Sequence, residues 1–387
     1  MYKNRYPVIF VHGMFGWGSS VGIDKIAPYW GSTTGNLINY LTDCGYECYS
    51  ASVGPVSSAW DCACELYAQL CGTKVDYGKA HSEFHSHDRF GRTYSSPLIN
   101  NFGERKVHLI GHSHGGQVIR LLAHLLTYGD ENEKESTSHD DISVLFTGGK
   151  EDWISSITTI CTPNNGTTLF SMAEKANIVK PLGRATDFAM AILGRTPLHG
   201  RFIDYQLEQY GLTPLRKEKK ADKILTAMNK MRDTDDNVLT DLSFQGAQTL
   251  NQKIEISRNI NYFCYTSNGC TGEKYEPKNI KLALLKPLSR LISDKKIPEG
   301  ECGIITDESW RENDGLVNTP SGRNPIDEPA KEYDGIIEPG IWNVMPVLQG
   351  DHGQAAGLMA NKDKLHGFYK NHIQMLIRTD ESFSKIT

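Results

Sequence analysis

A serine flanked by glycines lies between an apolar run and an amphipathic run of the sequence. The segment Gly111-His112-Ser113-His114-Gly115 follows apolar residues 107–110 and precedes the apolar-rich stretch 118–126. This pattern predicts a nucleophile elbow, in which glycines let a strand and a helix approach closely and leave the serine hydroxyl accessible. Gly-x-Ser-x-Gly alone also occurs in ordinary loops, but the flanking runs favour catalysis. Ser113 is therefore the expected nucleophile.

The C-terminal third of the sequence offers the two partners that such a serine needs. An imidazole must accept the hydroxyl proton, and a carboxylate must orient that imidazole. In elbow-containing folds the order along the chain is serine, acid, histidine. Asp314 precedes a glycine and an apolar pair, and His352 lies in a glycine-flanked loop after an apolar run. An isolated Asp-Gly is usually only a turn, but order and position favour Asp314 as the acid and His352 as the base.

A glycine-rich loop near the N-terminus complements the elbow. The apolar run 6–11 predicts a buried strand, and His12-Gly13-Met14-Phe15-Gly16-Trp17-Gly18 follows it. Attack on an ester carbonyl creates an oxyanion that needs preorganised N–H donors. One donor comes from the residue after the nucleophile and the other from the loop after the first central strand. The expected oxyanion hole is therefore formed by the amides of His114 and Met14.

Residues 73–94 are rich in histidine, aspartate, glycine and serine and lack a clear period, which indicates an inserted excursion. Asp61, His81 and His87 offer one carboxylate and two imidazoles, which suit a tetrahedral zinc site if a fourth ligand comes from elsewhere. His85 is an equally suitable ligand on these grounds. Histidine-rich loops usually bind no metal tightly, so the residues alone leave this site as a hypothesis.

The wider pattern predicts an α/β fold with a parallel sheet covered on both faces, formed by one core with excursions. Strands are expected near residues 6–11, 47–53, 107–112 and 153–161, and helices near 34–43 and from residue 60 onward. Residues 168–194 are apolar and partly helical in period. They are interpreted as a lid that hides an apolar face over the active site, with a buried core helix as the alternative.

Composition narrows the class of protein. The chain has 387 residues and a formal net charge of -5, and its basic cluster at 216–220 is interrupted by a glutamate, so nucleic-acid binding is not expected. No apolar stretch reaches the roughly 18 residues of a membrane span, and we expect a soluble chain whose export signal was removed or never present. The nine cysteines are interpreted mainly as small buried hydrophobes, with a Cys44–Cys48 disulfide left open.

The motifs together resemble the zinc-containing, thermoalkalophilic bacterial lipases called family I.5, which are related to staphylococcal lipases. The resemblance covers nearly the whole chain. It is carried by His12–Gly18, Ser57–Asp61, Val75–His81, His87–Tyr94, the elbow and Glu312–Thr319. It implies an α/β-hydrolase fold in one domain, residues 1–387, with a zinc-binding insertion at 60–95 and a helical lid and zinc-contacting excursion at 165–245.

The resemblance also assigns residues. It places the triad on Ser113, Asp314 and His352, favours His87 over His85, and gives Asp241 as the fourth zinc ligand beside Asp61, His81 and His87. Four protein ligands leave no open position, so the zinc is expected to be structural.

Three departures from the family follow. The family commonly has phenylalanine at Met14 and glutamine at His114, but both act through backbone N–H groups. The relatives bind calcium through a glutamate that is Gln354 here, so calcium is doubtful, with Asp363 as a candidate ligand of a rearranged site.

The sequence thus predicts a secreted carboxylic-ester hydrolase, a triacylglycerol lipase or esterase that works through an acyl-enzyme. Its expected substrate is a lipid or ester, met at a lipid–water or polymer surface. The alternative within the class is a short-chain esterase or polyester hydrolase without interfacial activation. A non-catalytic binding protein on the same fold is the rival from another class; it would lack the ordered nucleophile, acid and base.

Overall fold

The central element is a seven-stranded sheet. The structure is a computed structural model that describes residues 2–170, 204–212, 221–294, 304 and 306–383. All six strand pairings of this sheet are parallel, in the order β2-β1-β5-β6-β7-β10-β9. The strands are β1 Val8–Val11, β2 Cys48–Ala51, β5 Val107–His112, β6 Ile154–Ile160, β7 Asn261–Tyr265, β9 Ala330–Glu332 and β10 Trp342–Val344.

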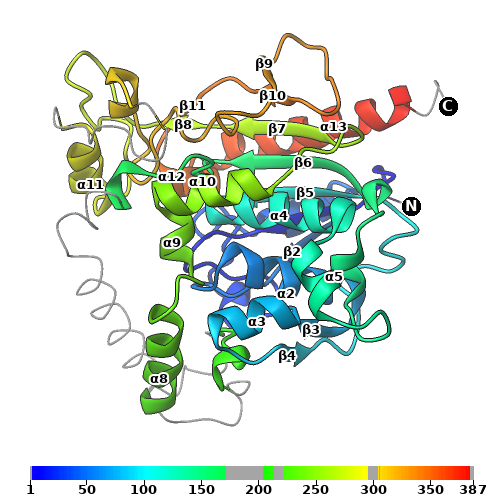
Figure 1. Cartoon of the computed structure of the whole chain (residues 1–387). Coiled ribbons are helices and arrows are strands. Elements are labelled where there is room, and N and C mark those ends of the chain that lie inside the picture. The colour runs from blue at the N-terminus through cyan, green and yellow to red at the C-terminus, as the bar shows by residue number, and fades with distance from the viewer. Residues whose placement is uncertain (1, 171–203, 213–220, 295–303, 305, 384–387) are drawn as a thin grey trace.

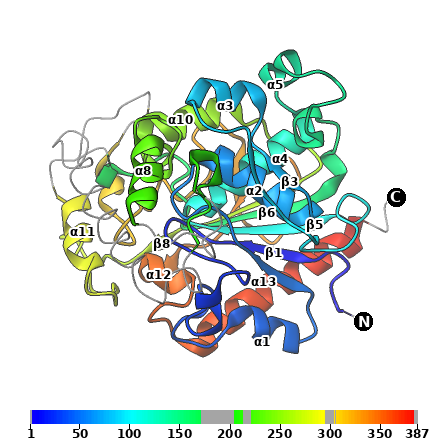
Figure 2. The ribbon, with the colours of Figure 1, turned by 90° about the horizontal axis from the view of Figure 1, so that it is seen from below.

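Helices cover both faces of the sheet (Figures 1 and 2). Helices α1 and α13 lie on one face, and α2, α4 and α10 lie on the other. The helices are α1 Leu37–Asp43, α2 Ala59–Cys71, α3 Lys79–His85, α4 His114–Tyr128, α5 Glu131–Ser136, α8 Ala221–Arg232, α9 Val238–Leu242, α10 Phe244–Lys253, α11 Leu285–Ile292, α12 His352–Ala355 and α13 Lys362–Phe383. Short 3-10 helices are η1 Gly22–Lys25, η2 Val144–Thr147, η3 Glu151–Trp153, η4 Glu208–Tyr210 and η5 Glu308–Arg311.

The first central strand shows why two layers of helices are needed. All four of its side chains are buried, and successive side chains of a strand point to opposite faces. Ile9 and Val11 join the apolar core beneath α2 and α4, whereas Val8 and Phe10 join the core beneath α1 and α13. A strand with apolar residues on both faces is stable only inside the molecule. The predicted parallel sheet covered on both faces is confirmed.

Two excursions leave this sheet. Strands β3 Lys74–Asp76 and β4 Phe90–Thr93 pair antiparallel, with α3 between them in sequence, so the irregular segment 73–94 has regular elements. The described part of the other excursion carries η4, α8 and α9, whose apolar side chains form a cluster separate from the two sheet cores. Strands β8 Ser267–Asn268 and β11 Leu348–Gln349 form a short parallel pair.

Most of the strands and helices expected from the sequence are present. The expected strands agree with β1, β2, β5 and β6, and the expected helices with α1 and α2. Most of the expected lid, residues 171–194, lies outside the described residues. Cys44 and Cys48 are free thiols, so the disulfide left open for them is not formed. Across the described ranges, no helix combines the length and the apolar character of a membrane span.

Buried neutral histidines are built into the fold. His372 of α13 bridges the Thr158 hydroxyl at 2.8 Å and the Tyr265 hydroxyl at 3.0 Å. Burial lowers the pKa of His372 to about 3, that of His124 to about 4, and that of His12 to about 4. Each of these side chains therefore remains uncharged in the folded protein at neutral pH.

We expect the protein to lose stability in mild acid. In the unfolded chain a histidine takes up a proton near pH 6.5, whereas these folded-state pKa values are about 3 to 4. Their contribution is thus present above pH 6.5 and is lost as pH falls toward 4, by roughly 3 kcal/mol per histidine. Urea unfolding at several pH values should show this slope, and His372→Asn should reduce it. A free energy of unfolding that stays constant from neutral pH down to the folded-state values would contradict the prediction.

Candidate active site and metal centre

Ser113 lies in the turn between β5 and α4 with a strained backbone, φ 56° and ψ -131°. Its N–H donates to the Ile160 carbonyl at 2.9 Å, which fixes the turn to the neighbouring strand. A Cβ on Gly111 would lie 2.4 Å from the Gly115 carbonyl oxygen, and one on Gly115 would lie 2.5 Å from the His12 carbonyl oxygen. Glycine is therefore required at both positions, as the elbow motif predicts.

The predicted acid and base are hydrogen bonded. His352 Nδ1 lies 2.8 Å from Asp314 Oδ2, and because a carboxylate oxygen accepts, Nδ1 carries the proton and Nε2 is left free as a base. The other oxygen of Asp314 accepts the N–H groups of Leu316 at 3.0 Å and Val317 at 2.8 Å. The His352 N–H also donates to the Asp314 carbonyl at 2.9 Å. Both carboxylate oxygens are thus held, and the imidazole is oriented.

The elbow and the acid–base pair meet through the residue that precedes the nucleophile. The ring of His112 lies 4.7 Å from the ring of His352, centroid to centroid. The exposed fractions are 9% for Ser113 and 6% for His352. The structure therefore places Ser113, His352 and Asp314, the predicted nucleophile, base and acid, in one buried region, where charge–charge and hydrogen-bond interactions are stronger than in water.

The loop predicted to form the oxyanion hole lies directly against Ser113. A Cβ on Gly13 would lie 3.2 Å from Ser113 Oγ and 2.6 Å from its Cβ, so only glycine fits. The loop is held by the Phe15 N–H, which donates to the Pro55 carbonyl at 2.8 Å. In the described part of the chain, no hydrogen-bond acceptor faces the amide N–H of Met14 or of His114. Both donors are thus available for an oxyanion.

His12 shapes this loop as a neutral side chain. Its Nδ1 lies 2.9 Å from the Gly13 carbonyl oxygen, and its Nε2 accepts the Val53 N–H at 3.2 Å. Burial, together with the nearby His114, lowers the pKa of His12 to about 4 despite these bonds. His12 therefore carries no charge that would compete for the oxyanion.

The structure corrects one predicted metal ligand. Asp241, expected beside the zinc, turns its Oδ2 to the Ala59 N–H at 2.6 Å and to His114 Nε2 at 3.1 Å. The carboxylate that joins the other predicted ligands belongs to Asp236. Asn237 caps α9 between them, so Asp236 lies just before the helix and Asp241 in its first turn on another side. The run Asp235-Asp236 ahead of the cap was the available signal in the sequence.

The ligand group is Asp61, His81, His87 and Asp236, with one ligand atom of each within 4.8 Å of the others. His81 Nε2 lies 3.4 Å from Asp61 Oδ1 and 3.4 Å from Asp236 Oδ1, and His87 Nε2 lies 3.4 Å from Asp236 Oδ2. The group includes His87 and leaves His85 out, as the family resemblance implies.

The donor set fits zinc. Asp61 Oδ1, His81 Nε2 and His87 Nε2 are buried without a hydrogen-bond partner, which is costly unless a cation fills the space between them. His87 Nδ1 lies 3.0 Å from the Asp88 carbonyl, and this bond leaves Nε2 as the ligand atom. Two carboxylates and two imidazoles also balance a divalent charge. Protons compete for the same atoms: burial opposes protonation, but the carboxylates of Asp236 and Asp61, each 3.4 Å from Nε2, raise the pKa of His81 to about 9.

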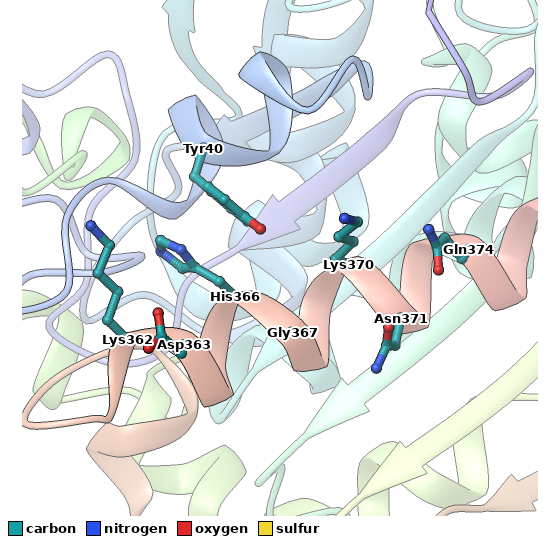
Figure 3. A pocket seen from close by; sticks show the side chains of 8 residues that line it. All are labelled: Tyr40, Lys362, Asp363, His366, Gly367, Lys370, Asn371 and Gln374. Atoms are coloured by element: carbon teal, nitrogen blue, oxygen red, sulfur yellow. The ribbon is translucent and has the colours of Figure 1, made fainter.

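The residues considered for calcium do not form such a group. The Gln354 side chain accepts the Asp351 N–H at 3.3 Å and donates to the Met359 carbonyl at 3.3 Å, so both ends serve protein contacts. Asp363 lines a groove of about 560 Å³ between α1 and α13 (Figure 3), and the other lining residues include no second carboxylate. The lining residues are Tyr40, Lys362, Asp363, His366, Gly367, Lys370, Asn371 and Gln374. Among the described residues that line this groove, Asp363 is thus the single carboxylate.

A second group of possible metal ligands lies inside the active site, formed by His112, Cys161 and His352. Its imidazoles are engaged: His112 bonds through both nitrogens and His352 through Nδ1. Burial and the adjacent Asp314 carboxylate raise the pKa of the Cys161 thiol well above its usual range. The side chains of this group are therefore already engaged with protein partners beside the predicted triad.

The fold belongs to the α/β-hydrolase class. It has a parallel sheet with helices on both faces and an elbow serine after β5, and an acid and a histidine follow on later loops. Within that class, the family described as "Lipase-like, C-terminal domain" matches residues 4–386. The chain belongs to this family. The resemblance to bacterial lipases seen in the sequence is thereby confirmed.

Relatives and solved structures agree with this assignment. A lipase of Staphylococcus hyicus is 36% identical over 393 residues, covering 99% of this chain and 59% of the relative. Lipase 1 of Staphylococcus aureus (strain MRSA252) is 32% identical and is 55% covered, so the chain spans little more than half the length of these two relatives.

Two solved lipase structures are matched over nearly their full lengths. Lipase 1 from Pelosinus fermentans is 37% identical with a TM-score of 0.80, covering 97% of this chain and 99% of that one. The Staphylococcus hyicus lipase structure is 32% identical with a TM-score of 0.82, covering 99% and 98%.

The metal centre can be tested with a matched pair of variants. We expect zinc at this group to stabilise the folded state, so chelation should lower the Tm by about 5 °C or more. Asp236→Asn should lose zinc by elemental analysis, whereas Asp241→Asn should keep one ion per chain. Zinc retained in Asp236→Asn, or a Tm that chelation does not change, would contradict the assignment.

Proposed function

We propose that the protein hydrolyses carboxylic esters, as a lipase or esterase, through an acyl-enzyme formed on Ser113. The observation that carries this proposal is the Asp314–His352 hydrogen bond of 2.8 Å, set against an elbow serine that adopts a positive φ. A structural serine gains nothing from such strain, whereas a nucleophile gains accessibility. The chain's membership in a lipase-like family supports the same reaction.

The proposed reaction begins with attack of Ser113 Oγ on the ester carbonyl while His352 Nε2 takes the hydroxyl proton. The oxyanion accepts hydrogen bonds from the amides of Met14 and His114, and Asp314 stabilises the imidazolium. The bond to the alcohol oxygen then breaks, and the alcohol leaves with the proton from Nε2. Water adds to the acyl group by the same steps in reverse, which releases the acid and restores Ser113.

The neighbourhood of the oxyanion loop supports an apolar acyl chain. Met14 packs against the cluster of the excursion, whose buried members include Val56, and Phe170 and Leu239 pack there too. An acyl chain that leaves the reacting carbonyl beside Met14 would meet this apolar wall. The proposal therefore favours fatty-acid esters, encountered outside the cell at a lipid–water surface, as the resemblance implies.

In this proposal zinc has a structural role. When bound, it supplies a fixed divalent charge that ties α2 and the β3–β4 excursion, through Asp61, His81 and His87, to the segment that carries Asp236. The chain's own residues perform every step of the hydrolysis.

Replacing the nucleophile tests the function. Ser113→Ala should lower kcat on a water-soluble chromogenic ester by about 10³-fold or more, because attack by Oγ is lost. An organophosphonate should label the wild-type protein on Ser113. A folded Ser113→Ala protein with full activity, or wild-type protein that resists the label, would refute the proposal.

Substrate presentation separates a lipase from a short-chain esterase or polyester hydrolase. For a lid-gated lipase we expect the rate on a triacylglycerol to rise sharply above its solubility limit, because the apolar face of the lid is exposed at the interface. The measurement is the initial rate below and above that limit. A smooth saturation curve through the limit would favour the alternative.

A further inference from the structure

A continuous chain of hydrogen bonds joins the oxyanion loop to the catalytic histidine. The Gly13 N–H donates to the Tyr29 hydroxyl at 3.0 Å, and the Tyr29 hydroxyl lies 2.6 Å from His112 Nδ1. His112 Nε2 lies 3.0 Å from the backbone carbonyl oxygen of His352. Three loops that are distant in sequence therefore meet at the Tyr29–His112 pair.

The chemistry of the end groups fixes the direction of these bonds. The His352 carbonyl oxygen accepts, so His112 Nε2 carries the hydrogen. Burial and the neighbouring His352 lower the pKa of His112 well below its usual range, so the ring is neutral and its Nδ1 accepts from the Tyr29 hydroxyl. Since the phenol donates to His112, its lone pairs receive the Gly13 N–H. Each donor in this series of hydrogen bonds therefore has one acceptor.

The segment that carries Tyr29 is also fastened to the loop after the catalytic histidine. The Gly31 N–H donates to the Ala356 carbonyl at 2.7 Å, and the Thr33 hydroxyl donates to the Gly357 carbonyl at 2.9 Å. The Tyr29 N–H donates to Asp24 Oδ1 at 3.3 Å. Tyr29 therefore has a fixed position relative to the loop that follows His352.

We propose that Tyr29 and His112 are positioning residues that fix the oxyanion loop and His352 relative to each other. The inference rests on the proposed function. His352 is held at its N–H by the Asp314 carbonyl and at its carbonyl by His112, so its backbone is fixed on both sides. A neutral His112 also adds no positive charge beside the imidazolium that forms during the reaction. A small rotation of His352 or Gly13 would misalign the groups that act on the substrate, which costs rate more than binding.

The test is a double-mutant cycle on steady-state hydrolysis of a water-soluble ester. Tyr29→Phe removes only the hydroxyl and should lower kcat about tenfold with KM within about twofold, because two buried partners lose their bond. His112→Gln keeps an N–H that can donate to the His352 carbonyl but places no acceptor at the position of Nδ1, which faces the phenol. In its background Tyr29→Phe should have a smaller effect than in wild type, because the two residues are coupled.

The chain supplies a matched control in a second buried tyrosine–histidine pair. The Tyr265 hydroxyl lies 3.0 Å from His372 Nδ1, without contact to the triad, so Tyr265→Phe should lower the Tm and leave kcat unchanged. A wild-type kcat in Tyr29→Phe would overturn the proposal; if that variant does not fold, a wild-type kcat in His112→Gln would do the same. The proposal also fails if the two substitutions lower kcat independently, so that their effects multiply in the double variant. It fails as well if Tyr265→Phe lowers kcat as much as Tyr29→Phe does.

The two proposals fail separately. An inactive Ser113→Ala protein together with a fully active Tyr29→Phe protein would refute the positioning role alone. Hydrolysis that survives Ser113→Ala would refute the proposed function.

Discussion

The strained turn at Ser113 is the constraint on which the rest of the site depends. A serine at φ 56° costs about 1–3 kcal/mol and persists only where its surroundings enforce it. Here the Ser113 N–H is bonded to β6, and Gly111, Gly13 and Gly115 allow contacts that a Cβ would block. The same close approach brings the oxyanion loop within reach of Oγ. The strain and the catalytic geometry therefore have one cause, which is the tight packing of β1, β5 and α4.

Buried charge is balanced differently in the candidate active site and in the metal-ligand group. In the catalytic centre, Asp314 meets backbone N–H groups and one imidazole, and the other histidines nearby, His12 and His112, are kept neutral by burial. In the metal centre, two carboxylates and two imidazoles leave three buried atoms without partners. The first arrangement is complete with protein groups alone. The second is complete only with a cation, which is why zinc is proposed there.

The sequence was informative where function depends on local pattern or on order along the chain. The elbow lies within five residues, and Asp314 and His352 follow it in the order the fold requires, so the sequence alone could single out these three candidates. The family resemblance gives Asp241 as the fourth ligand, whereas the carboxylate beside the other three ligands belongs to Asp236, on the other side of the Asn237 helix cap. Which of them faces the ligands depends on the rotation of α9 against α2, a tertiary property that spacing does not encode.

Tyr29 and His112 illustrate the same limit more sharply. His112 is part of the elbow motif, yet the motif says nothing of its side chain, and Tyr29 belongs to no motif at all. Their role follows from three loops that converge after folding, at Gly13, His112 and His352. The hydrogen bonds between these loops fix the position of the base relative to the strained elbow. Catalytic residues can thus be read from a sequence more readily than the residues that hold them in place, because chemistry restricts residue type whereas positioning restricts only geometry.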